Sequence, residues 1–209
     1  MFRIKICGIT SAADAAMAVA CGADAVGINF YRGSRRHVAA SEAAPIVAAV
    51  RGKAVPVAVF VNELPEAIAE VCRTLGIDVV QLSGHEPPAV ARQLTFRRIK
   101  AVHARDGSEL ASYRDYPCEA ILLDAAVEGE YGGTGKTLDW ANIERIRPGK
   151  PLILAGGLTA ENVTAAILAV RPDGVDVASG VESAPGKKDP EKVKAFIKNA
   201  MKGFDIARE

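Results

Sequence analysis

Short hydrophobic stretches alternate with segments of helical pattern along the chain. Eight such stretches, often rich in β-branched residues, precede the helical segments. Near-continuous apolar character is typical of strands that are buried on both faces, as in a parallel sheet. We therefore expect strands at residues 3–7, 25–29, 55–61, 79–82, 96–102, 120–123, 151–155 and 174–178.

Helix start signals lie between these stretches. Ser11 and Asp14 approximate a capping box, with aspartate in place of the usual glutamate. Asp189 precedes Pro190, a favourable pair for the first turn of a helix. Apolar residues at positions i, i+3, i+4 and i+7 predict one buried helix face in each of the segments 68–75, 163–170 and 193–200.

The strand–helix unit recurs about every 20–30 residues. Its eightfold repetition predicts an α/β protein with a single (β/α)8 barrel, the TIM-barrel fold. A doubly wound open sheet is the alternative, but that fold would place a GxGxxG turn after the first strand, and this chain has none there. No low-complexity linker interrupts the pattern, so we expect one domain over residues 1–209.

Composition and charge narrow the function classes. The 209 residues include 26 lysines and arginines against 25 acidic residues, which gives a net charge of +1, and only 5% are aromatic. This balance disfavours nucleic-acid and membrane-surface binding, and no apolar run reaches the roughly 20 residues of a membrane span. The four cysteines show no paired spacing. That pattern argues against disulfides and a metal site and favours a cytoplasmic protein.

In a (β/α)8 barrel the active site lies at the carboxyl ends of the strands. Reactive side chains at the expected strand ends are Cys7, Asn29, Asn62, Gln81, His103, Asp124, Asp176 and Ser179. Two glycine-containing turns, Gly156-Gly157 and Ser179-Gly180, follow the seventh and eighth stretches. Loops at these two places commonly hold a phosphate group with backbone N–H groups, although glycines can also serve tight turns alone.

Cys7 ends the first stretch and precedes a glycine, so its side chain should face the mouth of the barrel. Lys5 lies on the same strand face and could favour the thiolate. A buried cysteine is more often a core residue than a catalytic one, so the residues alone leave both interpretations open. Cys21 and Cys72 are expected to be structural.

Asp124 follows three apolar residues and brings a carboxyl group to the end of the sixth strand. The segment 128–136 beyond it is polar and glycine-rich, which suggests a lid over a site. Arg36 suits bidentate recognition of a carboxylate, but it could equally be a solvated charge. His85 and His103 have no partners at metal-ligand spacing, and we expect them to be surface or packing residues.

Several motifs, in order along the chain, resemble those of the phosphoribosylanthranilate isomerase family. They are KICGIT at 5–10, VAVFVN at 57–62, VQL at 80–82, LD at 123–124, GGTGKT at 132–137, AGGL at 155–158, DVASGVE at 176–182 and PGKKD at 185–189. Three positions depart from the family pattern: Arg35 replaces proline, Ser83 replaces histidine and Leu138 replaces phenylalanine. Arg35 leaves open which arginine holds the substrate carboxylate.

The resemblance implies a (β/α)8-barrel enzyme of tryptophan biosynthesis that carries out an Amadori rearrangement. It implies Cys7 as general base, Asp124 as general acid and Arg36 as the partner of the anthranilate carboxylate. Gln81 and Asp176 are expected to contact the substrate, and backbone amides around Gly156-Gly157 and Ser179-Gly180 to hold its phosphate.

No metal or organic cofactor is required, because the iminium ion of the opened substrate is the electron sink. The expected partner is a small phosphorylated substrate, and the chain is expected to be a monomer or a homodimer. The alternatives are a Schiff-base aldolase that uses Lys5, a related isomerase of the histidine pathway, and a barrel that binds a sugar phosphate without catalysis.

Overall fold

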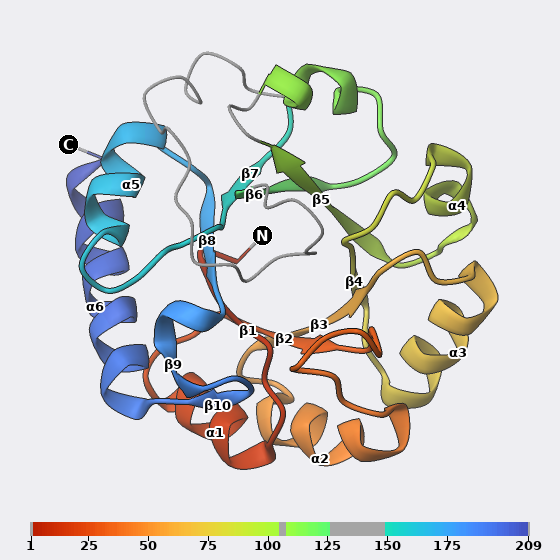
Figure 1. Cartoon of the computed structure of the whole chain (residues 1–209), viewed down its shortest axis with the longest axis horizontal. Coiled ribbons are helices and arrows are strands. Elements are labelled where there is room, and N and C mark those ends of the chain that lie inside the picture. Colours follow the sequence, from red (N-terminus) through yellow and green to blue (C-terminus); the bar gives the residue numbers. More distant parts are fainter. Residues whose placement is uncertain (1, 105–107, 126–148, 209) are drawn as a thin grey trace.

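Eight parallel strands close into a barrel (Figure 1), which confirms the predicted fold and excludes the open sheet. The computed structural model describes residues 2–104, 108–125 and 149–208. The strands follow one another around the barrel in sequence order, and β8 pairs with β1. They are β1 (Ile4–Cys7), β2 (Ala25–Asn29), β3 (Val55–Phe60), β4 (Val79–Leu82), β5 (Arg97–Ala104), β6 (Ala120–Ala125), β7 (Leu152–Leu154) and β8 (Gly174–Val177).

Helices surround the barrel and cover the outer face of the sheet (Figure 1). The α-helices are α1 (Ala12–Ala20), α2 (Ala40–Val50), α3 (Pro65–Leu75), α4 (Pro88–Gln93), α5 (Val163–Val170) and α6 (Pro190–Ile206). The shorter elements are the 3-10 helices η1 (Ser108–Tyr113) and η3 (Ser179–Val181) and the hairpin of β9 (Glu182–Ala184) and β10 (Lys187–Lys188).

The two predicted helix starts are confirmed. The Ser11 hydroxyl accepts a hydrogen bond of 3.1 Å from the Asp14 main-chain N–H, which satisfies one donor at the start of α1. The Asp189 carboxylate accepts hydrogen bonds of 3.0 Å from the N–H groups of Glu191 and Lys192, and Pro190 opens α6. The two capped helices contact each other on the outside of the barrel.

The hydrophobic core has two layers. The larger layer lies between the barrel and its helices and includes Ile6, Val26 and Phe196, all of them buried. The smaller layer fills the barrel itself with alternate side chains of the strands, such as Val57 and Leu122. This alternation explains why the strands are apolar on both faces, as the sequence predicted.

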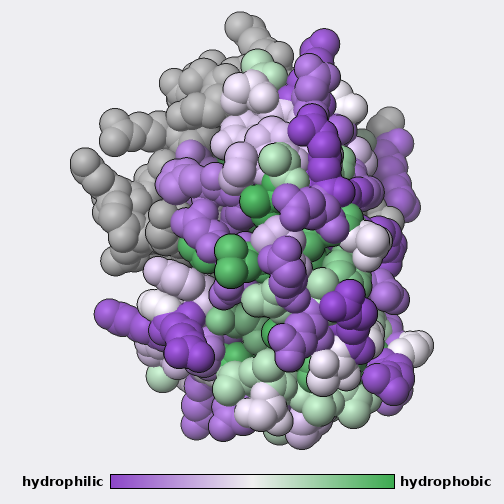
Figure 2. All heavy atoms as spheres, turned by 90° about the vertical axis from the view of Figure 1, so that its right-hand side faces the viewer, coloured by the Kyte–Doolittle hydropathy of each residue, from purple (hydrophilic) through white to green (hydrophobic). Residues whose placement is uncertain are grey.

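On the side of the barrel that carries α3 and α4, hydrophilic residues surround smaller hydrophobic areas (Figure 2). Helix α3 illustrates the cause, since it buries Ile68, Cys72 and Leu75 and exposes its other face. Within the described ranges, no helix combines the length and apolar character needed to cross a membrane.

Candidate active site

A cavity of about 500 Å³ opens at the carboxyl ends of the strands. Its walls come from all parts of the described chain, because successive strands each deliver one end to the same face of the barrel. Asn62, expected at the end of the third strand, is not among the residues that line this cavity, and its side-chain oxygen accepts a hydrogen bond from the His85 N–H. The residues predicted to bind or act on the substrate all line it: Cys7, Arg36, Gln81, Asp124, Gly156, Gly157, Asp176, Ser179 and Gly180.

Cys7 lies beside a buried ion pair. The Lys5 Nζ atom is 2.9 Å from Asp176 Oδ1, and the Lys5 side chain is fully buried inside the barrel. Gly27 leaves the space that this cluster occupies, since a Cβ atom at Gly27 would lie 2.6 Å from Cys7 Sγ and 3.1 Å from Lys5 Nζ. The prediction that Lys5 and Cys7 share one strand face is therefore confirmed.

The electrostatic effect of Lys5 on the thiol is weaker than expected. Burial raises the pKa of Cys7 above its ordinary value, and the neighbouring Lys5 ammonium opposes this shift without overcoming it. Burial alone would lower the pKa of Lys5, but Asp176 and Cys7 raise it above its ordinary value. The resting site therefore holds a charged lysine beside a protonated thiol.

Asp124 on β6 and His103 on β5 are neighbours in the barrel. Their Cα positions pair in register, and both residues line the cavity. The His103 Nε2 atom lies 3.1 Å from the carbonyl oxygen of Ser83, and burial lowers the pKa of the imidazole. His103 therefore lies on the cavity wall at the end of the fifth strand, and β5 runs two residues further than predicted.

Gln81 contributes an amide to the cavity wall. Its Nε2 group donates a hydrogen bond of 2.9 Å to the Ser83 hydroxyl, whereas its Oε1 atom is buried and has no hydrogen-bond partner among the described residues. A buried acceptor without a donor is costly unless a ligand satisfies it. Ser83, where the resembling family has histidine, thus helps to orient the Gln81 side chain.

The two glycine turns have the backbone geometry expected of an anion site. Gly156 and Gly157 adopt positive φ angles of 80° and 65°, and in the described part of the chain no acceptor takes up their N–H groups. A Cβ atom at Gly180 would overlap the carbonyl oxygen of Leu158. Glycine at position 180 therefore lets the loops after β7 and β8 approach each other.

Arg36 is held in place by an acidic residue that the sequence analysis did not single out. Its Nε and Nη2 groups donate hydrogen bonds of 2.8 and 2.7 Å to the two carboxylate oxygens of Glu182. The stem of Arg36 passes over Gly8, where a Cβ atom would overlap the arginine Cδ. Arg35 also lines the cavity but is exposed. The only signal of Glu182 in the sequence was its place at the end of the DVASGVE motif.

Two predictions concern residues that the structure does not describe. The suggested lid at 128–136 and the departure at Leu138 lie outside the described residues. Among the residues that the structure does describe, no group of three or more histidine, cysteine, aspartate or glutamate side chains could hold a metal ion.

The chain is similar to known enzymes over almost its whole length. Residues 4–199 match the family model described as N-(5'phosphoribosyl)anthranilate (PRA) isomerase. The N-(5'-phosphoribosyl)anthranilate isomerase of Trichlorobacter lovleyi is 47% identical over 205 residues, which cover 98% of this chain and 100% of that protein.

Solved structures agree with the sequence match. The crystal structure of phosphoribosyl anthranilate isomerase from Thermotoga maritima superposes with a TM-score of 0.89 and 44% identity, covering 97% of this chain and 100% of that chain. A phosphoribosyl anthranilate isomerase in complex with reduced 1-(o-carboxyphenylamino)-1-deoxyribulose 5-phosphate gives a TM-score of 0.84 and 40% identity, with the same coverage.

Proposed function

The chain belongs to the N-(5'-phosphoribosyl)anthranilate isomerase family, and we propose that residues 1–209 form one catalytic domain with Cys7 as general base and Asp124 as general acid. It is an isomerase of tryptophan biosynthesis. The reaction is an Amadori rearrangement, which converts an aminoaldose phosphate into an aminoketose phosphate. The observation that carries the assignment is that a thiol, a carboxyl group and two glycine turns from separate strands line one cavity.

Two groups of residues on the cavity wall are assigned to the phosphate and the carboxylate of the substrate. We assign the phosphate to the N–H groups around Gly156-Gly157 and Ser179-Gly180, because positive φ angles and close backbone approach suit an anion. We assign the anthranilate carboxylate to Arg36 rather than Arg35, because Arg36 is fixed by Glu182 whereas Arg35 is exposed.

The chemistry needs one acid and one base. Asp124 protonates the ribose ring oxygen, so that the ring opens to an iminium ion. Cys7 then removes the C2′ proton, and the resulting enolamine tautomerises to the ketone. The two groups lie on β6 and β1, which allows them to act on different atoms of one bound sugar.

The raised pKa of the Cys7 thiol sets a condition on this mechanism. The thiolate is the base, and a positive charge close to it favours that form. Lys5 supplies one such charge, and the iminium ion supplies a second when the sugar ring is open. The thiolate form of Cys7 is therefore most favoured at the stage of the reaction that requires it.

The decisive experiment follows the loss of phosphoribosylanthranilate fluorescence with the wild type, Cys7→Ala and Asp124→Asn. We expect both variants to lose kcat far more than they raise KM. Cys72→Ala is the matched control, because Cys72 is buried in α3 and does not line the cavity. Near-normal kcat in either active-site variant would show that the assignment of acid or base is wrong.

The oligomeric state is a separate part of the proposal. One solved relative at 40% identity is described as monomers generated from the dimeric phosphoribosylanthranilate isomerase of Thermotoga maritima, and we propose that this chain is a monomer or a homodimer. Light scattering on the purified protein at micromolar concentration distinguishes the two, and a larger assembly would contradict both.

A further inference from the structure

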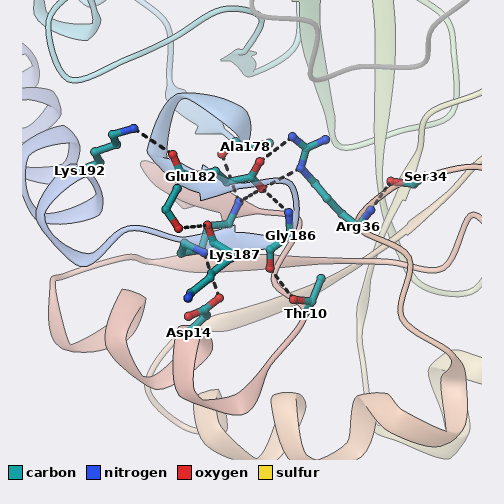
Figure 3. A network of polar contacts seen from close by, with 11 residues as sticks. Thr10, Asp14, Ser34, Arg36, Ala178, Glu182, Gly186, Lys187 and Lys192 are labelled. Carbon is teal, nitrogen blue, oxygen red and sulfur yellow. Dashed lines mark hydrogen bonds and ion pairs between the residues drawn. The ribbon is translucent and has the colours of Figure 1, made fainter.

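Glu182 links the loop after β2 to the hairpin of β9 and β10, which lies 146 residues further along the chain. Its side chain forms an ion pair with Arg36, in the loop after β2 (Figure 3), and a second ion pair with Lys188, in β10. The exposed fractions of the three side chains are 5% for Glu182, 15% for Arg36 and 0% for Lys188. A buried carboxylate between two cations is a specific arrangement, because each desolvated charge needs partners.

The protein satisfies both oxygens of Glu182. Oε1 accepts hydrogen bonds from Arg36 Nε at 2.8 Å, from Lys188 Nζ at 2.8 Å and from the Gly186 N–H at 3.3 Å. Oε2 accepts one from Arg36 Nη2 at 2.7 Å. Glu182 is therefore not placed to accept a bond from substrate, and its effect on the reaction has to pass through Arg36.

The pairing leaves one edge of the guanidinium free for a ligand. Glu182 takes the Nε–Nη2 edge, and within the described part of the chain the Nη1 group of Arg36 has no hydrogen-bond partner. Arg36 also lines the cavity. Because a guanidinium is planar, anchoring one edge fixes the direction of the Nη1–Nη2 edge, which can bind a carboxylate through two hydrogen bonds.

Charge explains why Lys188 is part of the arrangement. A lone Glu182 would cancel the charge of Arg36 and weaken its attraction for a carboxylate. Lys188 adds a second positive charge, so the three side chains together carry +1. Lys188 is itself fixed, since its Nζ donates to the Ala178 carbonyl oxygen at 3.1 Å and its main-chain N–H donates to Asp14 Oδ2 at 3.1 Å.

We propose that Glu182 and Lys188 are positioning residues for substrate recognition: Glu182 orients Arg36, and Lys188 preserves the positive charge that binds the anthranilate carboxylate. This inference rests on the proposed role of Arg36. It concerns the affinity for one substituent of the substrate and not the acid–base steps.

The test compares two stable ligands in binding assays. One is reduced 1-(2-carboxyphenylamino)-1-deoxyribulose 5-phosphate, and the other is the same reduced compound without the carboxyl group. Lys188→Met should weaken binding of the first ligand roughly tenfold and leave the second unchanged. The double variant Glu182→Gln/Lys188→Met restores the net charge of the cluster to +1 and should recover most of the lost affinity. If the two residues had only structural roles, the losses of affinity from the two substitutions would add.

Glu182→Ala separates positioning from charge. It raises the net charge of the cluster to +2, so electrostatics alone would strengthen binding of the carboxylated ligand. Loss of the Arg36 orientation should instead weaken binding of the carboxylated ligand by roughly tenfold. Unchanged affinity for the ligand without the carboxyl group would show that the site is still folded. Stronger binding by Glu182→Ala, or a further loss in the double variant, would overturn the proposal.

Two further variants complete the design. Lys192→Met is the matched control, because Lys192 Nζ contacts the main-chain oxygen of Glu182 at 2.9 Å and not its carboxylate (Figure 3); it should bind both ligands like the wild type. Arg36→Met should lose the preference for the carboxylated ligand. If Arg36→Met keeps the preference for the carboxylated ligand, the proposed role of Arg36 is wrong. If Arg36→Met loses this preference and Lys188→Met keeps it, only the inference about Glu182 and Lys188 is wrong.

Discussion

Lys5 Nζ and Asp176 Oδ1 form an ion pair of 2.9 Å inside the barrel, with exposed side-chain fractions of 0% and 9%. The two residues also pair in register on β1 and β8. Each charge has lost most of its water, so each depends on the other for solvation. Because Cys7 lies two residues after Lys5 on the same strand face, this pair also sets the electrostatic environment of the proposed base.

The first prediction concerns stability. Lys5→Met leaves the Asp176 carboxylate buried without its partner and should lower the free energy of unfolding by about 3–5 kcal/mol. The double variant Lys5→Met/Asp176→Asn removes both charges and should be less destabilised than the single variant. Urea unfolding at neutral pH measures both values. Equal losses in the two proteins would show that the ion pair does not determine the stability of this part of the barrel.

The second prediction concerns pH. Because the folded protein raises the pKa of Cys7 above its ordinary value of 9.0, the thiolate fraction falls as the pH falls, and kcat/KM should rise with pH through a limb above 9.0. Lys5→Met removes the charge that opposes this shift, so its limb should move to still higher pH. Profiles of kcat/KM against pH for both proteins test this, and a wild-type limb near neutrality would contradict it.

The third prediction concerns the space beside the thiol. Gly27→Ala would place a Cβ atom 2.6 Å from Cys7 Sγ, so the sulfur has to move and kcat should fall by tenfold or more, on the order of what a small misplacement costs. Gly52→Ala is the control. A Cβ atom at Gly52 would meet nothing within 4 Å, but the residue has a φ of +72°. This substitution should cost about 1 kcal/mol of stability with kcat unchanged. Equal kcat in both variants would rule out the steric argument.

The sequence predicted the barrel because its signals are local. Each expected strand segment overlaps an observed strand, and the caps at Ser11 and Asp189 lie where the residues indicated. Residues at the strand ends, with the exception of Asn62, were therefore placed correctly around one cavity. A period of two also placed Lys5 on the same face as Cys7.

What the sequence did not reveal depends on contacts between distant segments. Arg36 and Glu182 are 146 residues apart, so no local pattern could show that one orients the other. The apolar pattern also ends before the fifth strand does, because hydrogen bonding to β6 extends β5 to Ala104. The direction of the Cys7 pKa shift depends on burial of the thiol, which only the packed barrel determines.

The fourth prediction concerns Gln81, where stability and binding should respond in opposite directions. Gln81 Oε1 is buried without a hydrogen-bond partner among the described residues, and Nε2 makes one bond of 2.9 Å to Ser83. Leaving the acceptor unsatisfied costs about 1–3 kcal/mol, while the bond contributes about 0.5–1.5 kcal/mol. Gln81→Leu removes both, so we expect the free energy of unfolding to rise by about 1 kcal/mol.

The same substitution should impair binding, because a buried acceptor on the cavity wall is suited to a hydroxyl or N–H donor of the substrate. We expect KM for phosphoribosylanthranilate to rise by roughly tenfold, equivalent to about one lost hydrogen bond. Urea unfolding and steady-state kinetics on one protein preparation measure both effects. A variant that is more stable and keeps the wild-type KM would show that Oε1 has no role in binding, and a less stable variant would show that the amide is satisfied in the free enzyme.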